Sequence, residues 1–245
     1  MTSILAAVLC AAGPATVYDA TLGEAEKTAE VSTAEMKQIL ENKSAMVFDS
    51  RPAREYAVGH IPGALNVSAK PGVPISVYVS DVNEIERTVK GDKATPIVLY
   101  CNGPFCQKSK RLAAELIDAG FANVRRYQLG MPTWRAFVGV QQVELEGLRY
   151  VLEKDKTAVL LDARGTSELP GAKGLLLADV KKAKDDGRLP MLDHNTRILV
   201  VGANAAQARA LAEAVAKEAF DNVAFFGGDP AQLRGAPDGA RTADK

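Results

Sequence analysis

Residues 45–51 read Ala-Met-Val-Phe-Asp-Ser-Arg, and residues 158–164 read Ala-Val-Leu-Leu-Asp-Ala-Arg. Each stretch is a short apolar run that ends in Asp-x-Arg, and such a run predicts a buried strand. An apolar helical stripe precedes both runs, and one residue of each stripe, Ile39 or Leu152, lies ten positions before the aspartate. The shared order and spacing indicate one folding unit that occurs twice.

The repeat continues along both halves of the chain. Residues 96–100 and 197–201 predict a second buried strand, and amphipathic helices follow at about 107–119 and 205–219. Strands that alternate with helices are typical of parallel α/β sheets, where ligands bind outside the carboxyl ends of the strands. The predicted fold class is therefore α/β, with two tandem domains that are each a mainly parallel sheet flanked by helices.

The predicted organisation has four segments. A repeat of about 100 residues has the size of a domain, and we expect the boundary near residues 138–144. The segments are a signal peptide at 1–20, a first domain at 25–140, a second domain at 141–235 and a flexible tail at 236–245.

The apolar run near the N-terminus decides the expected localisation. Residues 4–12 are small or apolar, and the run is far shorter than the ~20 residues that span a bilayer but close in size to a signal-peptide core. Residues 1–3 carry no Lys or Arg, which is atypical of such a leader. We expect a periplasmic or secreted protein, and the alternative is a short buried helix or a tail on a cytoplasmic protein.

Composition argues against several classes of function. The 245 residues contain 30 Lys and Arg and 30 Asp and Glu, so the formal net charge of zero gives no electrostatic reason to expect nucleic acid as a partner. Three cysteines are too few for a disulfide scaffold, and two isolated histidines are too few for a His-rich metal site. We expect no cofactor, no bound metal and no membrane span.

The loop after the second predicted strand carries the chemistry. Cys101 is the first residue past that strand, and Gly103 and Pro104 let a tight loop curl around it into the next helix. Backbone N–H groups in a curled loop and at a helix start favour an anion, and three basic side chains among residues 108–111 add positive charge. These effects favour the thiolate of Cys101, which is the nucleophilic form of a cysteine.

Three segments, in this order and at suitable spacing, resemble the rhodanese family of sulfurtransferases. Residues 49–66 contain Asp-Ser-Arg, Glu-Tyr and Gly-His-Ile-Pro-Gly-Ala-Leu-Asn, which are similar to the first signature of the family. Tyr100 and Cys101 with the short loop match its active-site loop, and residues 130–134 resemble its closing Gly-Gly-x-x-x-Trp segment. The chain from about residue 30 to residue 235 resembles a tandem rhodanese.

The resemblance implies an enzyme that works through Cys101. This residue would take a sulfane sulfur from a small anion such as thiosulfate, form a persulfide, and pass the sulfur to a thiol, a cyanide-like acceptor or a protein thiol. Asp49, Arg51 and His60 would support the fold, and a lone His close to Pro-Gly is itself more typical of a turn or core group than of a catalyst. The donor would be cradled by Asn102, Gly103, Pro104, Phe105, Cys106, Gln107 and Lys108.

Two sites depart from the family pattern. Met131 replaces the second glycine of the closing segment, and Phe105 and Cys106 stand where many active members carry a basic residue. Lys108 is the candidate replacement for that charge, and the identity of the donor stays open.

Cys106 has two interpretations. As a resolving thiol it would attack the Cys101 persulfide or form a disulfide within the loop, which would make the site redox-sensitive. As a packing residue it would face inward from the first turn of the helix. A non-catalytic module that uses the same loop to bind an anion or a partner, or to sense redox state, is the alternative to the enzyme.

The second half lacks the thiol. Gly202 stands where Cys101 stands in the first half, and it lies 18 residues before Phe220, whereas Cys101 lies 20 residues before Phe121. A single glycine between a strand and a helix is weak evidence for a nucleotide site. We expect a degenerate domain that packs against the first one and walls its active-site cleft.

Overall fold

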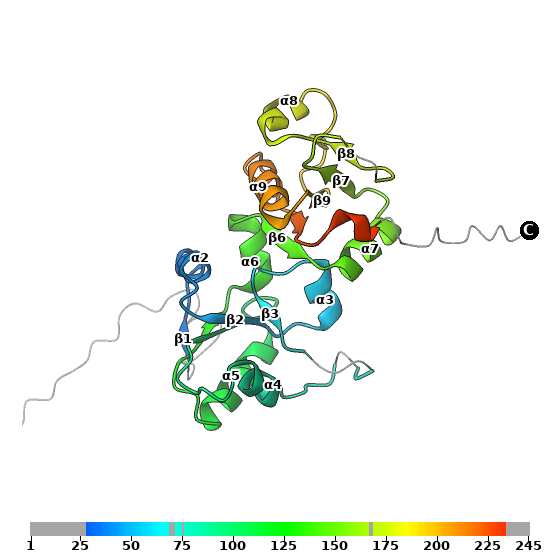
Figure 1. Ribbon diagram of the computed structural model, residues 1–245. Coiled ribbons are helices and arrows are strands. Elements are labelled where there is room, and N and C mark those ends of the chain that lie inside the picture. The colour runs from blue at the N-terminus through cyan, green and yellow to red at the C-terminus, as the bar shows by residue number, and fades with distance from the viewer. Residues whose placement is uncertain (1–27, 69–71, 75, 167–168, 234–245) are drawn as a thin grey trace, which may run out of the picture.

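The computed structural model describes residues 28–68, 72–74, 76–166 and 169–233, which form two five-stranded sheets (Figure 1). All neighbouring strands in both sheets run parallel. This arrangement confirms the predicted α/β class with two mainly parallel sheets. The signal peptide predicted at 1–20 and the tail at 236–245 lie outside the described residues, so both stay predictions.

The N-terminal unit, residues 29–137, contains five strands and five helices within the described residues. In chain order these are β1 (Ala29–Glu30), α2 (Thr33–Asn42), β2 (Met46–Asp49), α3 (Ala53–Val58), β3 (Leu65–Asn66), α4 (Val82–Thr88), β4 (Ile97–Tyr100), α5 (Gln107–Asp118), β5 (Val124–Tyr127) and α6 (Gly130–Phe137). Its strand order is β1-β5-β4-β2-β3.

The C-terminal unit, residues 140–233, repeats this topology. Its elements are β6 (Val140–Val143), α7 (Leu145–Lys154), β7 (Val159–Asp162), β8 (Lys173–Gly174), a 3₁₀ turn at Leu177–Asp179, α8 (Val180–Ala183), β9 (Ile198–Val201), α9 (Ala205–Ala216), β10 (Val223–Phe226) and a 3₁₀ turn at Pro230–Leu233. The order β6-β10-β9-β7-β8 matches the N-terminal sheet strand for strand. The sequence repeat is therefore a repeat of the whole sheet.

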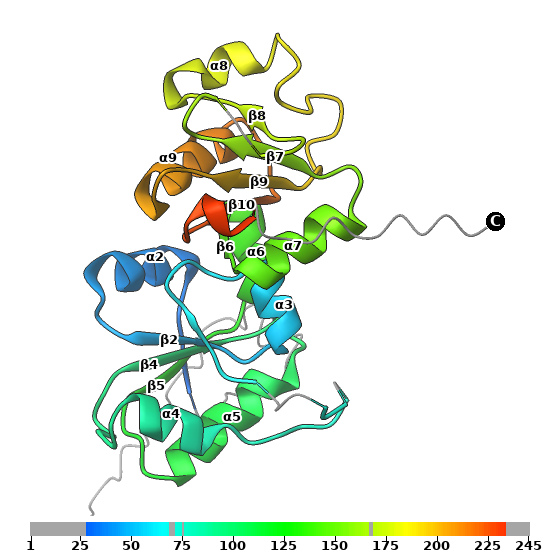
Figure 2. The same cartoon turned by 45° about the vertical axis from the view of Figure 1, so that its right-hand side comes forward.

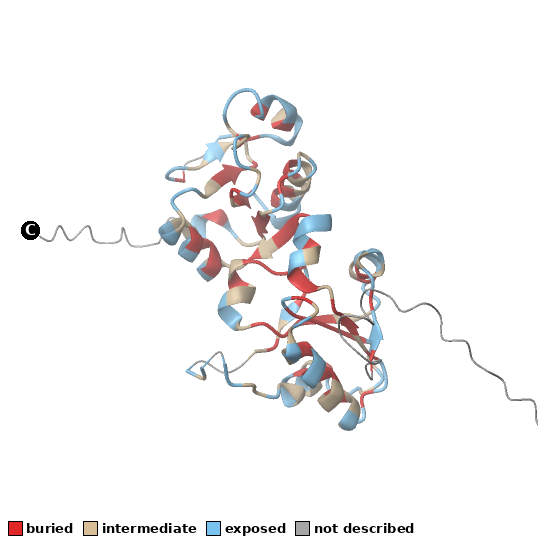
Figure 3. Ribbon diagram, turned by 180° about the vertical axis from the view of Figure 1, so that it is seen from behind, coloured by how far each residue is buried: buried red, intermediate tan, exposed pale blue. Residues whose placement is uncertain are grey.

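Helices cover both faces of each sheet because the strands are apolar on both sides. In the N-terminal unit, Phe48 and Leu99 pack in one core cluster with the helices α4 and α5. Their neighbours Val47 and Val98 point to the opposite face, where they pack with residues of α2 and α6. Figure 3 shows the resulting buried layer in each unit, with exposed helix surfaces outside it.

The C-terminal unit is layered in the same way. Leu161 and Val200 pack with residues of α8 and α9, and Leu160 and Leu199 pack on the other face with residues of α7. Continuous apolar strands of this kind are typical of parallel sheets buried on both faces.

The predicted strands and helices agree closely with the observed ones. The two strands that end in Asp-x-Arg are β2 and β7, and the helices expected at about 107–119 and 205–219 are α5 and α9. Ser32 caps α2, because its hydroxyl accepts a hydrogen bond from the N–H of Glu35 at 3.1 Å. None of the helices in the described parts of the chain is long and apolar enough to span a bilayer.

The two units contact each other through α3 and α7, which Figures 1 and 2 both show side by side. Backbone hydrogen bonds join His60 and Gln142 in both directions at 2.9 Å, and the N–H of Glu144 donates to the carbonyl oxygen of Ala57. A Cβ atom at Gly147 would lie 1.9 Å from that same oxygen, so only glycine permits this approach.

The contact between the units does not enclose Cys101. A groove of about 1250 Å³ lies between them, but it is lined by α2, α6, α9 and the amino-terminal ends of β2 and β4. Residues 101–108 belong to the opposite, carboxyl edge of the N-terminal sheet and do not line this groove. The expected packing of the second domain against the first is observed through α3 and α7, and the expectation that the second domain walls the active-site cleft stays a prediction.

His60 is buried at this contact and is held as a neutral imidazole. Its Nδ1 lies 2.9 Å from the carbonyl oxygen of Tyr56, which can only accept, so Nδ1 carries the proton. The Tyr56 ring stacks on the imidazole with 3.8 Å between centroids. Burial lowers the pKa of His60 to about 4, and the Glu144 carboxylate, 3.6 Å from Nε2, is too far for a hydrogen bond that would reverse this.

The neutral state of His60 predicts a pH dependence of stability. Between pH 4 and pH 6.5 the unfolded chain binds a proton here and the folded chain does not, so the free energy of unfolding rises with pH by up to about 3 kcal/mol. Urea unfolding across this window should show the rise in the wild type and lose most of it in His60→Asn, which keeps a donor for Tyr56. The control His194→Asn, at the other histidine, should retain it; equal slopes in wild type and His60→Asn would contradict the assignment.

Candidate active site

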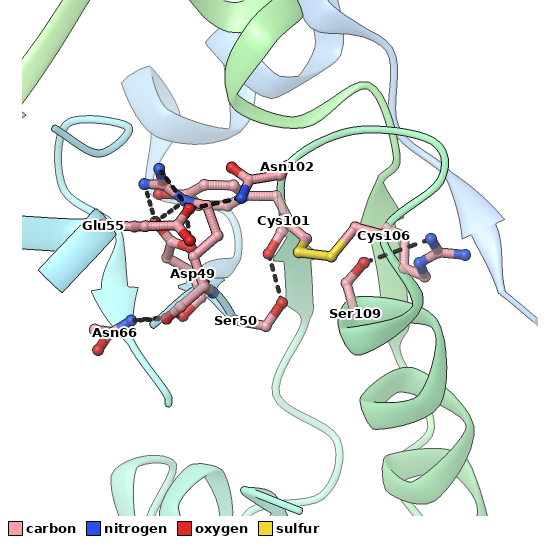
Figure 4. The surroundings of a disulfide bond; sticks show 11 residues. Asp49, Ser50, Glu55, Asn66, Cys101, Asn102, Cys106 and Ser109 are labelled. Atoms are coloured by element: carbon pink, nitrogen blue, oxygen red, sulfur yellow. Dashed lines mark hydrogen bonds and ion pairs between the residues drawn. A yellow bond between two sulfur atoms is a disulfide. The ribbon is translucent and has the colours of Figure 1, made fainter. Parts of the chain in front are cut away.

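Cys101 lies directly after β4, at the carboxyl edge of the N-terminal sheet, and is 3% exposed. The loop of residues 101–106 carries the chain from this strand into α5. Figure 4 shows a disulfide between Cys101 at the end of the strand and Cys106 at the start of the helix. The disulfide is one of the two outcomes that the resolving-thiol interpretation of Cys106 allows. Cys106 is half-buried and is the N-cap residue of α5.

The other cradle residues are divided between the loop and the helix. Asn102 and Phe105 are exposed, Phe105 by 71%, whereas Gly103 is buried and has φ +107°. Gln107 and Lys108 form the first turn of α5. The structure thus brings all seven predicted residues together around Cys101, in one continuous turn from strand to helix.

The loop contains backbone N–H groups that can bind an anion. The N–H of Cys106 is committed to the carbonyl oxygen of Gly103 at 3.0 Å. For the N–H groups of Asn102, Gly103 and Phe105, the described residues provide no acceptor. Unpaired N–H groups in a tight turn are a common binding site for small anions and for sulfur in its anionic forms.

Asp49 and Arg51 brace the strand ends beside the loop. The Arg51 Nε lies 3.0 Å and its Nη2 2.5 Å from the Asp49 carboxylate, and Nη2 also donates to the carbonyl oxygen of Gly59. The hydroxyl and the N–H of Ser50 both donate to the carbonyl oxygen of Tyr100, at 2.9 and 3.0 Å. These bonds tie β2 to the end of β4, one residue before the thiol.

Glu55 connects this brace to the loop itself. Its carboxylate accepts a hydrogen bond from the Asn102 side chain at 2.6 Å and lies 4.0 Å from the Arg51 guanidinium (Figure 4). Glu55 lies within the segment that resembles the first signature, but no role was predicted for it. Its position four residues after Arg51 was the available signal, because α3 places such a residue back over the strand ends.

The closing segment supports the loop from the other side. The N–H of Met131 donates to the carbonyl oxygen of Cys101 at 3.0 Å. A Cβ atom at Gly130 would lie 2.3 Å from that oxygen and 2.5 Å from the Gly103 nitrogen, and Gly130 has φ +62°. Trp134 then donates from Nε1 to the carbonyl oxygen of Val140, which anchors α6 to the first strand of the C-terminal unit.

The basic side chains near the loop have other partners than the sequence predicted. The Arg111 guanidinium lies over the Tyr78 ring, 5.5 Å from its centroid, and the charge of Lys108 acts on Asp81. Sequence analysis missed Arg126, which is 1% exposed on β5 and donates to the hydroxyl of Ser109 in the first turn of α5 at 3.4 Å. Burial lowers the pKa of Arg126 to about 10, so it stays charged at neutral pH.

The equivalent site of the C-terminal unit is closed. Gly202 is followed at once by α9, and a Cβ atom on it would lie 2.9 Å from the Ala208 nitrogen. The N–H of Ala203 donates to the Gln207 side chain at 2.8 Å, and the Asn204 side chain caps the helix. This loop has no thiol, and its Ala203 N–H is already paired with a side chain. Nevertheless, Asp162 and Arg164 form the same pair as Asp49 and Arg51.

Within the described ranges, no group of three or more His, Cys, Asp and Glu side chains lies close enough to hold a metal ion. The candidate site is therefore built on the sulfur atoms of Cys101 and Cys106 and on the groups that surround them.

Sequence comparisons identify the N-terminal unit. Residues 32–137 match the family described as the rhodanese-like domain. The HTH-type transcriptional regulator Rv0324 of Mycobacterium tuberculosis is 33% identical over 105 residues, which cover 43% of this chain and 41% of that protein. The tRNA uridine(34) hydroxylase of Buchnera aphidicola is 26% identical over 133 residues, 53% of this chain and 40% of that protein. The chain thus spans about two fifths of the length of these relatives.

The solved structures that this chain matches include sulfurtransferases. A thiosulfate sulfurtransferase of Pseudomonas aeruginosa is 19% identical, with a TM-score of 0.34, and the match covers 84% of this chain and 42% of that one. SseA of Escherichia coli, described as a 3-mercaptopyruvate sulfotransferase, is 16% identical with a TM-score of 0.37, covering 82% and 98%. The N-terminal unit, with its parallel sheet and cysteine loop, is therefore similar to rhodanese-like domains over residues 32–137.

Proposed function

We propose that the chain is a sulfurtransferase in which Cys101 carries the sulfur. The Cys101 thiolate attacks the sulfane sulfur of thiosulfate or a related anion. A persulfide forms on Cys101 while the S–S bond of the donor breaks, and sulfite leaves with the bonding electron pair. A thiophilic acceptor such as cyanide then attacks the terminal sulfur and leaves as thiocyanate, which returns Cys101 to the thiolate.

One observation carries this proposal. Cys101 lies in a loop whose N–H groups at Asn102, Gly103 and Phe105 have no acceptor among the described residues. A thiolate, a persulfide and a small oxyanion are all negatively charged, and each gains from the same N–H groups. The unit without a cysteine fills its loop with the Gln207 side chain instead, as expected where no anion has to be held.

The donor is an anion of modest size. Lys108 lies in the first turn of α5, the buried Arg126 of β5 donates to Ser109 in that turn, and exposed Phe105 forms an apolar rim on the loop. Since the Cys101–Cys106 disulfide engages the nucleophile, a dithiol reductant has to open it before the first transfer.

A second candidate is a redox-responsive binding module that uses the same loop. The disulfide favours it, because oxidation of Cys101 and Cys106 changes both the charge and the shape of the loop. A relative with the matching segment is a transcriptional regulator by name, so this kind of domain is not confined to enzymes. Sulfur transfer distinguishes the two candidates, because a binding module does not turn over.

Replacing Cys101 tests the enzyme directly. After reduction with dithiothreitol and its removal, the wild type should convert thiosulfate and cyanide to thiocyanate, and Cys101→Ser should lose this rate by about 1000-fold or more because a hydroxyl cannot hold the sulfane sulfur. Mass spectrometry of the treated protein should place one added sulfur atom on the peptide of Cys101. Cys10→Ser is the matched control and should behave as the wild type. An unchanged rate in Cys101→Ser would remove the proposal.

Gly130→Ala tests whether the closing segment shapes the loop. The new methyl group would meet the carbonyl oxygen of Cys101 at 2.3 Å, so the loop has to move and sulfur uptake should fall. Gly171→Ala is the matched control, because Gly171 also has positive φ, +74°, but has open space around its Cβ position. Urea unfolding should show Gly130→Ala to be less stable than Gly171→Ala by about 1–3 kcal/mol. Equal stability and full activity would mean that the contact does not constrain the loop.

A further inference from the structure

Cys101 and Cys106 lie in bonding position within one short loop. Their Cα atoms are 6.1 Å apart, within the usual range for a disulfide. Both residues belong to one short turn whose ends are fixed by β4 and α5. A reaction between the two sulfur atoms therefore needs no rearrangement of the sheet or of the helix.

The two sulfur atoms lie in different surroundings. Cys101 is 3% exposed and follows the strand, whereas Cys106 is half-buried and is the N-cap of the 12-residue helix α5. No side chain caps that helix, so the N–H groups of its first turn are available to the sulfur of Cys106. The partial positive charge of a helix N-terminus stabilises a thiolate at this position. Cys106 is thus equipped to act as an attacking thiolate.

A buried cation strengthens this end of the loop. Arg126 donates to the hydroxyl of Ser109, three residues after Cys106, and both side chains are buried. Because Arg126 stays charged at neutral pH, it adds to the positive potential at the first turn of α5.

We infer that Cys106 resolves the Cys101 persulfide and releases its sulfur as hydrosulfide, an inference that rests on the proposed function. The Cys106 thiolate attacks the Sγ atom of Cys101, and a bond forms between the two cysteine sulfurs. The bond from Cys101 Sγ to the terminal sulfur breaks, and the terminal sulfur leaves with the electron pair and takes up the proton that Cys106 had lost.

The step balances without an external oxidant. One persulfide anion and one thiol give one disulfide and one hydrosulfide anion. The terminal sulfur is reduced to sulfide, and the two cysteines together supply its two electrons. The product is the disulfide present in the structure, and a dithiol reductant restores both thiols for another cycle. The added activity is the reduction of thiosulfate to sulfite and hydrosulfide at the expense of a dithiol.

A single-turnover experiment without an acceptor tests the inference. The reduced full chain, freed of reductant under anaerobic conditions, is mixed with thiosulfate, and hydrosulfide is trapped with monobromobimane while the protein is analysed by mass spectrometry. The wild type should release one hydrosulfide per chain and end lighter than the reduced protein by two hydrogen atoms. Cys106→Ser should release none and keep the mass of one added sulfur atom on Cys101. Cys10→Ser, which removes the third cysteine, should match the wild type.

The possible outcomes distinguish a failure of the resolving step from a failure of the proposed sulfurtransferase function. If the wild type forms thiocyanate with cyanide but keeps its added sulfur and releases no hydrosulfide, the resolving step is wrong and the sulfurtransferase stands. Added sulfur found on Cys106 would also overturn it, because the attack would then be on the terminal sulfur. If neither wild type nor Cys106→Ser takes up sulfur or forms thiocyanate, the proposed function itself fails.

Discussion

The end of β4 is held from two sides, and the position of the thiol depends on that clamp. The carbonyl oxygen of Tyr100 accepts two hydrogen bonds from Ser50, and the carbonyl oxygen of Cys101 accepts one from Met131. The first donor follows β2 and the second follows β5, so the strands on both sides of β4 fix the residue that carries the sulfur. The loop can then curl over a rigid base, with its N–H groups in a defined place. Because Gly130 has no Cβ atom, the segment that contains Met131 can approach the carbonyl oxygen of Cys101.

The C-terminal unit shows which features belong to the frame and which to the chemistry. Strand order and the Asp-x-Arg pair occur in both units, although only one has a thiol. The pair therefore serves the fold, where it joins a strand end to the loop that follows. The loop after the central strand differs: α9 begins three residues after Gly202, whereas α5 begins six residues after Cys101. At this position the two units therefore differ in loop length and not in the sheet.

Sequence patterns predicted the strands of the sheet better than the contacts that helices and loops make around them, for a physical reason. Apolar runs such as residues 45–48 record burial on both faces, so the repeat and the Cys101 loop could be recognised from the chain alone. The contact of α3 with α7 could not, because it depends on Gly147, whose missing side chain matters only beside Ala57. Arg126 was overlooked because a charged residue on a strand is usually exposed, and its burial depends on α5 covering that face. Whether Cys106 packs inward or forms a disulfide could be decided only from the path of the loop in the structure.

The sequence predicted that the N–H groups of the loop and of the helix start both act on Cys101. In the structure, the longer loop places these two sets of N–H groups near different cysteines. The open N–H groups at Asn102, Gly103 and Phe105 lie within the turn that follows Cys101, whereas the N–H groups of the first turn of α5 lie beside Cys106 and donate to no capping side chain. In the C-terminal unit α9 begins three residues after Gly202, so the strand end and the helix start lie closer together along the chain. In the proposed cycle Cys101 attacks the donor, Cys106 attacks the persulfide, and a reductant then opens the disulfide between them. A disulfide between them is therefore suited to repeated opening and closing, as a catalytic pair requires, and less suited to a permanent structural link.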